Sequence, residues 1–315
     1  MSSVKGIIFG CLAGISYGTN PLGALHLYRE GLSPETVLCY RFAWAIVLLG
    51  VLILLRRDRG GRCRNRESRD DCCNNGCLRS IREKFAVAPR ELPVLATLGF
   101  LFAACALTLF ASFNYMDAGL ASTLLFMYPL EVSIIMWLFF KERLTLLTAA
   151  SIAVSLSGIA LLYRGGADGA SLSTVGFALV MVSSLTYSIY IVVVNRAKLQ
   201  MDSVKLSFYA MVFCLLFLVL YCVTLGSGLP SIPANGAQWG WGLMLGFVPT
   251  VLSLVFMAKA IRIVGSTPTA ITGALEPLTA VVIGVCVFDE AMSVRLAVGI
   301  ALILAAVVLL AIRRR

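Results

Sequence analysis

The sequence has few charged residues and few of the groups that catalyse reactions. Only 13% of its 315 residues are Asp, Glu, Lys or Arg, and it contains one histidine, His26. It lacks a His-Glu-x-x-His pair and a glycine-rich nucleotide loop followed by Lys-Ser or Lys-Thr. These absences argue against an enzyme and against a self-contained ATP-driven pump, and the sequence implies no cofactor.

Apolar residues are abundant instead, at 59% of the chain with a mean hydropathy of +0.91, which excludes an ordinary soluble protein. A membrane-spanning helix needs about 20 apolar residues, and the runs here are continuously apolar rather than alternating as barrel strands are. The predicted fold class is therefore an all-α integral membrane protein with ten transmembrane helices. The predicted spans are 5–25, 34–55, 92–113, 118–140, 144–163, 171–194, 203–224, 237–258, 264–288 and 292–312.

The positive charges follow these spans. With the N-terminus inside, 22 of the 26 Lys and Arg residues fall in inside segments; Arg29, Arg164 and Arg295 fall outside, and Arg41 lies within a span. Basic residues concentrate on the cytoplasmic side of membrane proteins, so both termini are predicted to be cytoplasmic. The net charge of +10 then reflects topology and attraction to anionic lipid rather than nucleic-acid binding. Compact loops and the lack of targeting motifs suit a multi-pass protein of a bacterial inner membrane.

One inside loop, residues 56–91, is long and rich in arginine and cysteine. Zinc binding by Cys63, Cys72, Cys73 and Cys77 is an alternative, but their spacing lacks the paired C-x2-C knuckles of such sites. The prediction is a flexible cytoplasmic insertion without a metal.

The two halves of the chain match each other. Tyr128-Pro129 is followed by Glu142 thirteen residues after the proline, and Glu276-Pro277 by Glu290 at the same spacing. Tyr17 in the first span pairs with Tyr187 in the sixth. An odd number of spans per half inverts the second half, so the sequence predicts inverted five-helix halves at 1–163, including the 56–91 loop, and 164–315.

Three short motifs carry a family resemblance. They are Ser33-Pro34 with Tyr40-Arg41-Phe42, Pro129 to Glu142-Arg143-Leu144-Thr145, and Glu276-Pro277 to Glu290. The chain resembles the drug/metabolite transporter superfamily, and within it the proteins with two EamA-type halves. The resemblance implies ten helices, a central cavity lined by the first, third and fourth helix of each half, and alternating-access movement of small organic solutes. Two features depart from the family pattern: the 56–91 insertion, and Asp289-Glu290-Ala291 at the position where the family more often has Gly-Glu-Arg. These departures leave the subfamily open.

Two acids lie deep in predicted spans. Glu131 and Glu276 are near mid-span, where a charged side chain costs about 2.5–3.5 kcal/mol on insertion scales. Alignment of Pro129 with Pro277 puts both on equivalent faces toward the cavity between the halves. Burial disfavours the charged form of a carboxyl group, so Glu131 and Glu276 are proton-coupling candidates. The alternative is a structural carboxyl group beside a helix-breaking proline.

Polar and aromatic residues add to this candidate site. Tyr17 and Asn20 are one helical turn apart, as are Tyr187 and Tyr190, and each pair presents a polar-aromatic face suited to a cavity wall. Packing between helices is the alternative for each tyrosine. With the two acids, and with Asn114, Tyr115 and Thr272 as weaker candidates, these residues are the predicted substrate-binding set.

Two further charges receive structural interpretations. Arg41 lies about 10 Å deep by helical rise, within snorkelling reach of the outer interface, so it is predicted to be a structural intramembrane charge, with anion binding as the alternative. Asp117, in the outer turn between two spans, is predicted to cap a helix.

The predicted function is secondary transport of a small organic metabolite, an amino acid or similar. The direction, export, is implied by the resemblance alone. A gradient or exchange would drive alternating access of the two halves. The predicted partners are a small-molecule substrate and the lipid bilayer, with no nucleic acid, and a homodimer is compatible with the sequence. The rival interpretation is a scaffold or sensor that recruits a cytoplasmic protein through the 56–91 loop; a channel ranks third.

Overall fold

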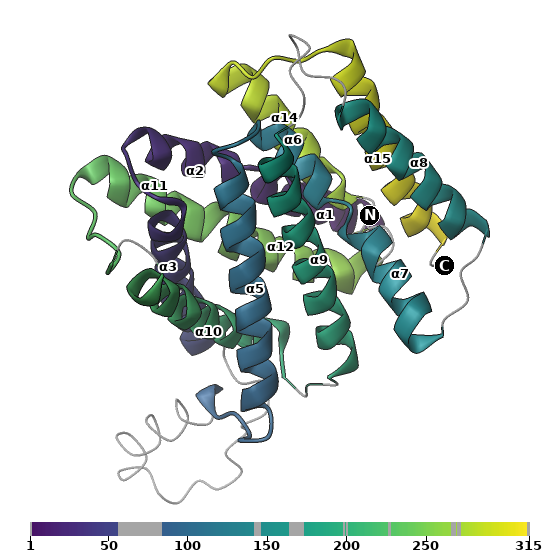
Figure 1. Cartoon of the computed structure of the whole chain (residues 1–315). Coiled ribbons are helices and arrows are strands. Elements are labelled where there is room, and N and C mark those ends of the chain that lie inside the picture. Colours follow the sequence, from purple (N-terminus) through teal and green to yellow (C-terminus); the bar gives the residue numbers. More distant parts are fainter. Residues whose placement is uncertain are drawn as a thin grey trace, which may run out of the picture.

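The protein is a bundle of helices (Figure 1). The computed structural model describes residues 2–55, 84–141, 146–163, 173–197, 199, 201–225, 228–265, 269 and 272–313. Within these ranges the elements are α1 (Ser2–Gly18), α2 (Asn20–Arg29), α3 (Pro34–Leu55), α5 (Leu92–Ser112), α6 (Ala118–Leu125), α7 (Tyr128–Phe140), α8 (Leu146–Tyr163), α9 (Thr174–Arg196), α10 (Ser203–Thr224), α11 (Gly236–Gly246), the π-helical η1 (Phe247–Leu252), α12 (Ser253–Val264), α14 (Leu275–Phe288) and α15 (Val294–Arg313). These ranges contain no strand, which confirms the all-helical part of the predicted class.

Many of these helices are long and apolar enough to cross a membrane. Among the described residues, six helical segments meet that criterion, namely Pro34–Leu55, Leu92–Ser112, Ala118–Phe140, Thr174–Arg196, Ser203–Thr224 and Gly236–Val264, and shorter apolar helices accompany them. Each of the ten predicted ranges contains helix. The number of spans and the side of the termini stay predictions. The cysteines of the 56–91 loop lie outside the described residues, as does Glu142.

Several predicted spans are interrupted. The first breaks at Thr19 between α1 and α2, and the fourth breaks at Phe126 and Met127 between α6 and α7. The eighth was expected to end at 258 but continues to Val264 through the π-helical turn η1. Broken helices leave backbone groups without helical partners, and in membrane proteins such backbone lies inside the protein or beside a cavity.

The helices α7 and α14 begin and end in the same way. Each carries a glutamate in its first turn, Glu131 in α7 and Glu276 in α14. Each ends at a left-handed residue, Lys141 at φ 55° and Asp289 at φ 57°. A left-handed residue after the last turn is a common helix stop. The sequence match around Pro129 and Pro277 therefore corresponds to a matched pair of short helices.

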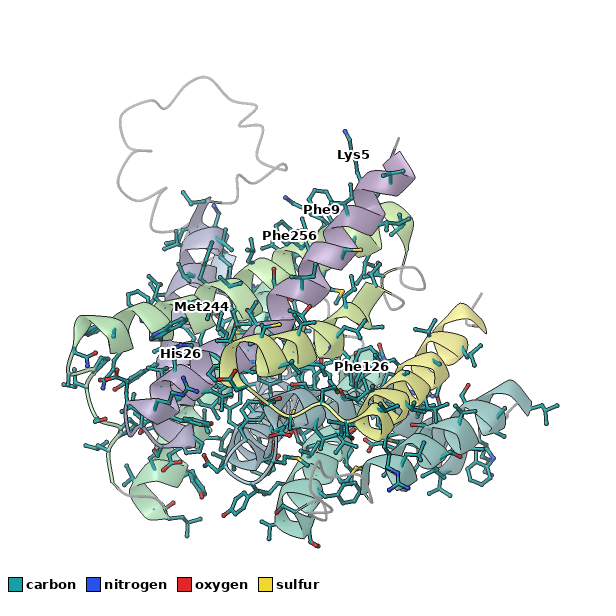
Figure 2. The ribbon with its side chains drawn as sticks, turned by 90° about the horizontal axis from the view of Figure 1, so that it is seen from above. Lys5, Phe9, His26, Phe126, Met244 and Phe256 are labelled. Carbon is teal, nitrogen blue, oxygen red and sulfur yellow. The ribbon has the colours of Figure 1, made fainter. Side chains whose placement is uncertain are left out.

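Contacts between the halves place these elements around a centre. Helix α1 packs on α12 and α14, α5 on α9 and α10, and α6 on α14, whereas α8 and α15 run side by side at one edge (Figure 1). Seen from above, Phe9 of α1 lies beside Phe256 of α12, with ring centroids 5.8 Å apart (Figure 2). A Cβ atom on Gly18 would come within 2.5 Å of the Glu276 carbonyl oxygen, so only glycine allows α1 to approach the start of α14 this closely.

The break in the fourth span also faces α14. The ring of Phe126, which is 2% exposed, lies next to Gly273, just ahead of α14: a Cβ atom there would be 3.8 Å from the ring. The two short helices α7 and α14 thus begin close to one another in the interior of the bundle.

Candidate functional site

A cavity of about 300 Å³ lies between the halves. Its walls come from α1, α3, α5, α6, α7, α9, α10, η1, α12 and α14, together with Thr269 and Gly273 ahead of α14. The side chains that define its chemistry are Tyr17, Arg41, Phe102, Cys105, Tyr128, Tyr187, Tyr190, Thr250 and Glu276. Pockets of this size, apolar with a few convergent polar groups, are typical of small-molecule sites.

One wall of the cavity is aromatic. The ring centroids of Tyr128 and Tyr187 are 4.8 Å apart in an edge-to-face arrangement, and those of Tyr187 and Tyr190 are 5.8 Å apart and nearly parallel. Phe102 continues the row, 5.6 Å from Tyr190. The Tyr187 and Tyr190 pair recognised on one helix face in the sequence therefore does line the cavity, beside Tyr17 of α1.

Sequence reasoning did not select Tyr128 as a site residue. The signal was present, because aligning Pro129 with Pro277 makes Tyr128 the counterpart of Glu276. Both residues line the cavity at the first turn of their helices. The matched positions of α7 and α14 thus supply a phenol on one side and a carboxylate on the other.

The two acids have different surroundings. Glu276 lines the cavity, and no described residue donates a hydrogen bond to its carboxylate. Glu131 is not among the cavity-lining residues; its Oε2 accepts a hydrogen bond of 2.8 Å from the Ser188 hydroxyl of α9. The two carboxylates therefore do not share one face of the cavity, because the register of α7 and α14 puts Tyr128, not Glu131, opposite Glu276.

Arg41 also reaches the cavity. Its depth in α3 had placed it within snorkelling reach of the outer interface. Instead, the side chain is buried, at 2% exposed. Its Nε donates a hydrogen bond of 3.0 Å to the Thr250 hydroxyl in the π-helical turn, while Thr250 donates to the carbonyl of Leu245 at 2.9 Å. Its Nη2 is buried without a hydrogen-bond partner. The guanidinium and the Glu276 carboxylate line the same cavity, yet the described residues show no salt bridge between the two.

The remaining candidates lie away from the cavity walls. Asn20 is buried and donates from Nδ2 to the carbonyl of Tyr17 at 2.9 Å, so it supports the break between α1 and α2. Thr272 donates to the carbonyl of Thr269 at 2.8 Å. Asn114 and Tyr115 are exposed in the turn after α5, Tyr115 at 53%. A substrate-binding role for these residues stays a prediction, without support from the cavity geometry.

The cavity extends toward one end of the bundle. Its lining includes the exposed residues Ser203, at the start of α10, and Ile261, near the end of α12. Arg262 of α12 and Asp202 beside α10 approach within 3.6 Å at this end, which shows that the two helix termini lie together. The predicted topology makes this the cytoplasmic end.

The two halves also contact each other beyond the end of α14, which the predicted topology places on the outer side. Glu290, just after α14, accepts hydrogen bonds from the backbone N–H groups of Ala118 and Gly119 at 2.8 and 3.3 Å, at the first turn of α6. Asp117 occupies the N-cap position but makes no capping bond, so the predicted cap is wrong: the glutamate of the other half replaces it. We refer to Glu290 with these two amides as the outer clasp.

Partial burial raises the pKa of Glu290 above its ordinary value, and the nearby charge of Asp117 adds to this increase. The amide bonds of the clasp act in the lowering direction because they stabilise the ionised carboxylate. Burial likewise raises the pKa of Asp117. The outer clasp is thus a partly dehydrated carboxylate held at the positive end of a helix.

A family comparison agrees with this architecture. The family model described as "EamA-like transporter family" matches the chain twice, over residues 4–164 and 174–312. The chain belongs to the EamA-like transporter family. It is therefore an integral multi-pass membrane protein of a transporter family rather than of an enzyme family. The position of the boundary between the halves, at 163/164, stays a prediction.

Curated relatives carry matching descriptions. A protein of Archaeoglobus fulgidus named "Uncharacterized transporter" is 27% identical over 74% of this chain and 79% of its own length. "Uncharacterized transporter YvbV" of Bacillus subtilis is 22% identical over 62% of this chain and 64% of its own length. A solved structure titled "Crystal structure of protein" shares the fold, with a TM-score of 0.60 over 98% of both chains at 18% identity. The EamA-like chain thus has sequence relatives described as transporters, and a solved structure shares its fold.

Proposed function

We propose that this EamA-like protein is a secondary transporter that exports a small organic metabolite, an amino acid or similar, by alternating access of its two halves. The observation that carries the proposal is the cavity between the halves, with Arg41 in its walls together with Tyr128 and Glu276 from the first turns of α7 and α14. Broken helices around a central site are the arrangement found in many secondary transporters.

The ends of the bundle support alternating access. The cavity reaches exposed residues at the end where α10 begins, while the outer clasp joins α14 to α6 at the other end. Closing the first end and opening the second would move a bound molecule across the membrane. Export is consistent with a cavity that starts from the predicted cytoplasmic side.

Proton coupling is assigned, within this proposal, to Glu276 rather than Glu131. Glu276 lines the cavity, and its carboxylate accepts no hydrogen bond from the described residues, so a substrate and a proton can compete for it. Glu131 is held by Ser188 and does not line the cavity. An intramembrane acid in a cavity is a functional candidate by default because an uncompensated charge there is costly.

Counterflow in proteoliposomes tests the proposal. Vesicles containing the purified full-length protein are loaded with unlabelled amino-acid or metabolite pools, and uptake of the labelled compound is followed at two pH values. Saturable exchange is expected, and Glu276→Gln should remove its pH dependence while Glu131→Gln retains it. Glu91→Gln, at the N-cap of α5 outside the cavity, is the matched control. Folded protein that exchanges none of the pools contradicts the transport proposal; unaltered pH dependence in Glu276→Gln contradicts the coupling alone.

A further inference from the structure

The surroundings of Arg41 leave one part of its guanidinium unused. Nε is bonded to Thr250, while Nη2 is buried without a partner. The guanidinium carbon lies 5.9 Å from the ring centroid of Tyr17, and 5.3 and 5.5 Å from those of Phe42 and Phe110. These rings hold the group in place but accept no conventional hydrogen bond from Nη2.

A buried cation with an unsatisfied donor is unfavourable unless another group compensates for it. Arginine keeps its charge under all ordinary conditions, so Arg41 does not relieve this by losing a proton. Glu276 lines the same cavity, but the described residues show no salt bridge between its carboxylate and the guanidinium. A ligand carboxylate bound to the guanidinium would supply an acceptor that the described residues do not.

The chemistry of the cavity limits the ligand class. A guanidinium presents planar donors that match a carboxylate. Glu276 in the same cavity repels a compact ion of several negative charges, whereas it tolerates one carboxylate placed at Arg41. The row of Tyr128, Tyr187 and Tyr190 provides an apolar and aromatic surface for the rest of the molecule.

We infer that Arg41 is the anion anchor of this cavity, and that the transported molecule is an organic carboxylate whose carboxylate binds the Arg41 guanidinium while its apolar body lies against the tyrosine wall. The inference rests on the proposed transport function. It changes the interpretation of Arg41 from a structural charge to a ligand-binding residue. Thr250 is then a positioning residue, because its bond to Nε fixes the plane of the guanidinium.

Four probes that share a phenyl ring and a short chain test the anchor on the parent protein. Phenylalanine and 3-phenylpropionate carry a carboxylate, whereas phenylalaninamide and phenethylamine do not. Binding to the purified full-length protein is measured by isothermal titration. Both carboxylates are expected to bind at least about tenfold more tightly than the two compounds without one. Equal binding of the four probes, or binding of none, overturns the inference. The difference in affinity between phenylalanine and 3-phenylpropionate measures how much Glu276 contributes to binding an ammonium group.

Variants locate the effect. Arg41→Gln should abolish the preference for carboxylates, and Arg41→Lys, which keeps the charge but not the planar donors, should retain only part of it. Thr250→Val should weaken carboxylate binding while leaving phenethylamine binding unaffected. Arg29→Gln is the matched control, since Arg29 also lies over an aromatic ring, Phe288 at 4.9 Å, but outside the cavity. A folded Arg41→Gln protein with an unchanged preference contradicts the anchor.

Transport measurements separate this inference from the function on which it rests. In counterflow, exchange of phenethylamine without exchange of either carboxylate would leave the transport function standing and refute the anchor. Folded protein that exchanges none of the four probes and none of the metabolite pools would refute both.

Discussion

The outer clasp makes a quantitative prediction about the conformational cycle. Glu290 of the second half accepts two hydrogen bonds from the amides of Ala118 and Gly119 in the first half. If the outer end opens during transport, both bonds must break. Replacing Glu290 with Ala removes them from the closed state and should shift the protein toward the outward-open state.

The size of the shift follows from the geometry. Hydrogen bonds to a charged group contribute about 1.5–3 kcal/mol each when well shielded. Glu290 is only partly buried and its bond to Gly119 is long at 3.3 Å, so we expect the pair to contribute about 2 kcal/mol in total. Since 1.4 kcal/mol is a factor of ten, the ratio of closed to open protein should fall by about 30-fold.

Distance measurements between spin labels check this value. Labels at Asn114, in the turn before α6, and at Val294, which is 83% exposed at the start of α15, report on the two sides of the clasp. They should be attached without thiol chemistry because the chain has ten cysteines. The parent protein should give one short distance, and Glu290→Ala should add a longer population.

Two further substitutions make the test specific. Gly284→Ala should act like Glu290→Ala, since a Cβ atom there would lie 2.0 Å from the Glu290 carboxylate oxygen and displace it. Asp289→Asn removes the neighbouring charge, and asparagine tolerates the left-handed backbone at this position, so it should leave the distances unchanged. An unaltered distribution in both Glu290→Ala and Gly284→Ala would refute the clasp as a closing contact.

Other parts of the structure give three more predictions. If opening exposes Glu290 to water, its raised pKa falls toward the ordinary value of 4.5 in the open state. Acidification from neutrality toward that value should then favour the closed outer end, because the closed state has the higher pKa. Spin-label distances across this pH range check the sign, and an increase in the open population on acidification would contradict it. Tyr187→Ala should weaken binding of an aromatic probe by about tenfold through loss of ring contacts, whereas Tyr187→Phe should change it little; titration of both variants decides between a ring contact and a hydroxyl contact. Deletion of residues 58–86 should leave counterflow intact, because the residues of that segment that the structure describes, 84–86, do not line the cavity. Loss of exchange in a folded deletion protein would favour the scaffold or sensor interpretation.

Sequence patterns predicted the helical class and part of the site because those features depend on local residue types. Continuous apolar runs indicate helices, and the matching sequences around Pro129 and Pro277 paired the fourth span with the ninth, in which α7 and α14 lie. Tyr187 and Tyr190 could be assigned to one face from their spacing alone. These inferences need no knowledge of which helices are neighbours.

The rest depends on contacts between distant segments. The π-helical turn has no unique sequence signature, although it is what brings Thr250 to Arg41 across 209 positions. The cap of α6 comes from Glu290 rather than from adjacent Asp117, a choice set by the packing of α14 on α6. The different surroundings of Glu131 and Glu276 likewise depend on packing: Tyr128 and Glu131 are only three residues apart on α7, yet Tyr128 lines the cavity while Glu131 bonds to Ser188 of α9.

The π-helical turn also makes the two halves energetically unequal. Its counterpart in the first half, α5, is one uninterrupted α-helix from Leu92 to Ser112. In an ideal inverted repeat, exchanging the roles of the halves converts one facing state into the other. Here that exchange cannot reproduce the contact between Thr250 and Arg41. If the halves exchange roles as proposed, this asymmetry gives the two facing states unequal energies even without a substrate or an ion gradient.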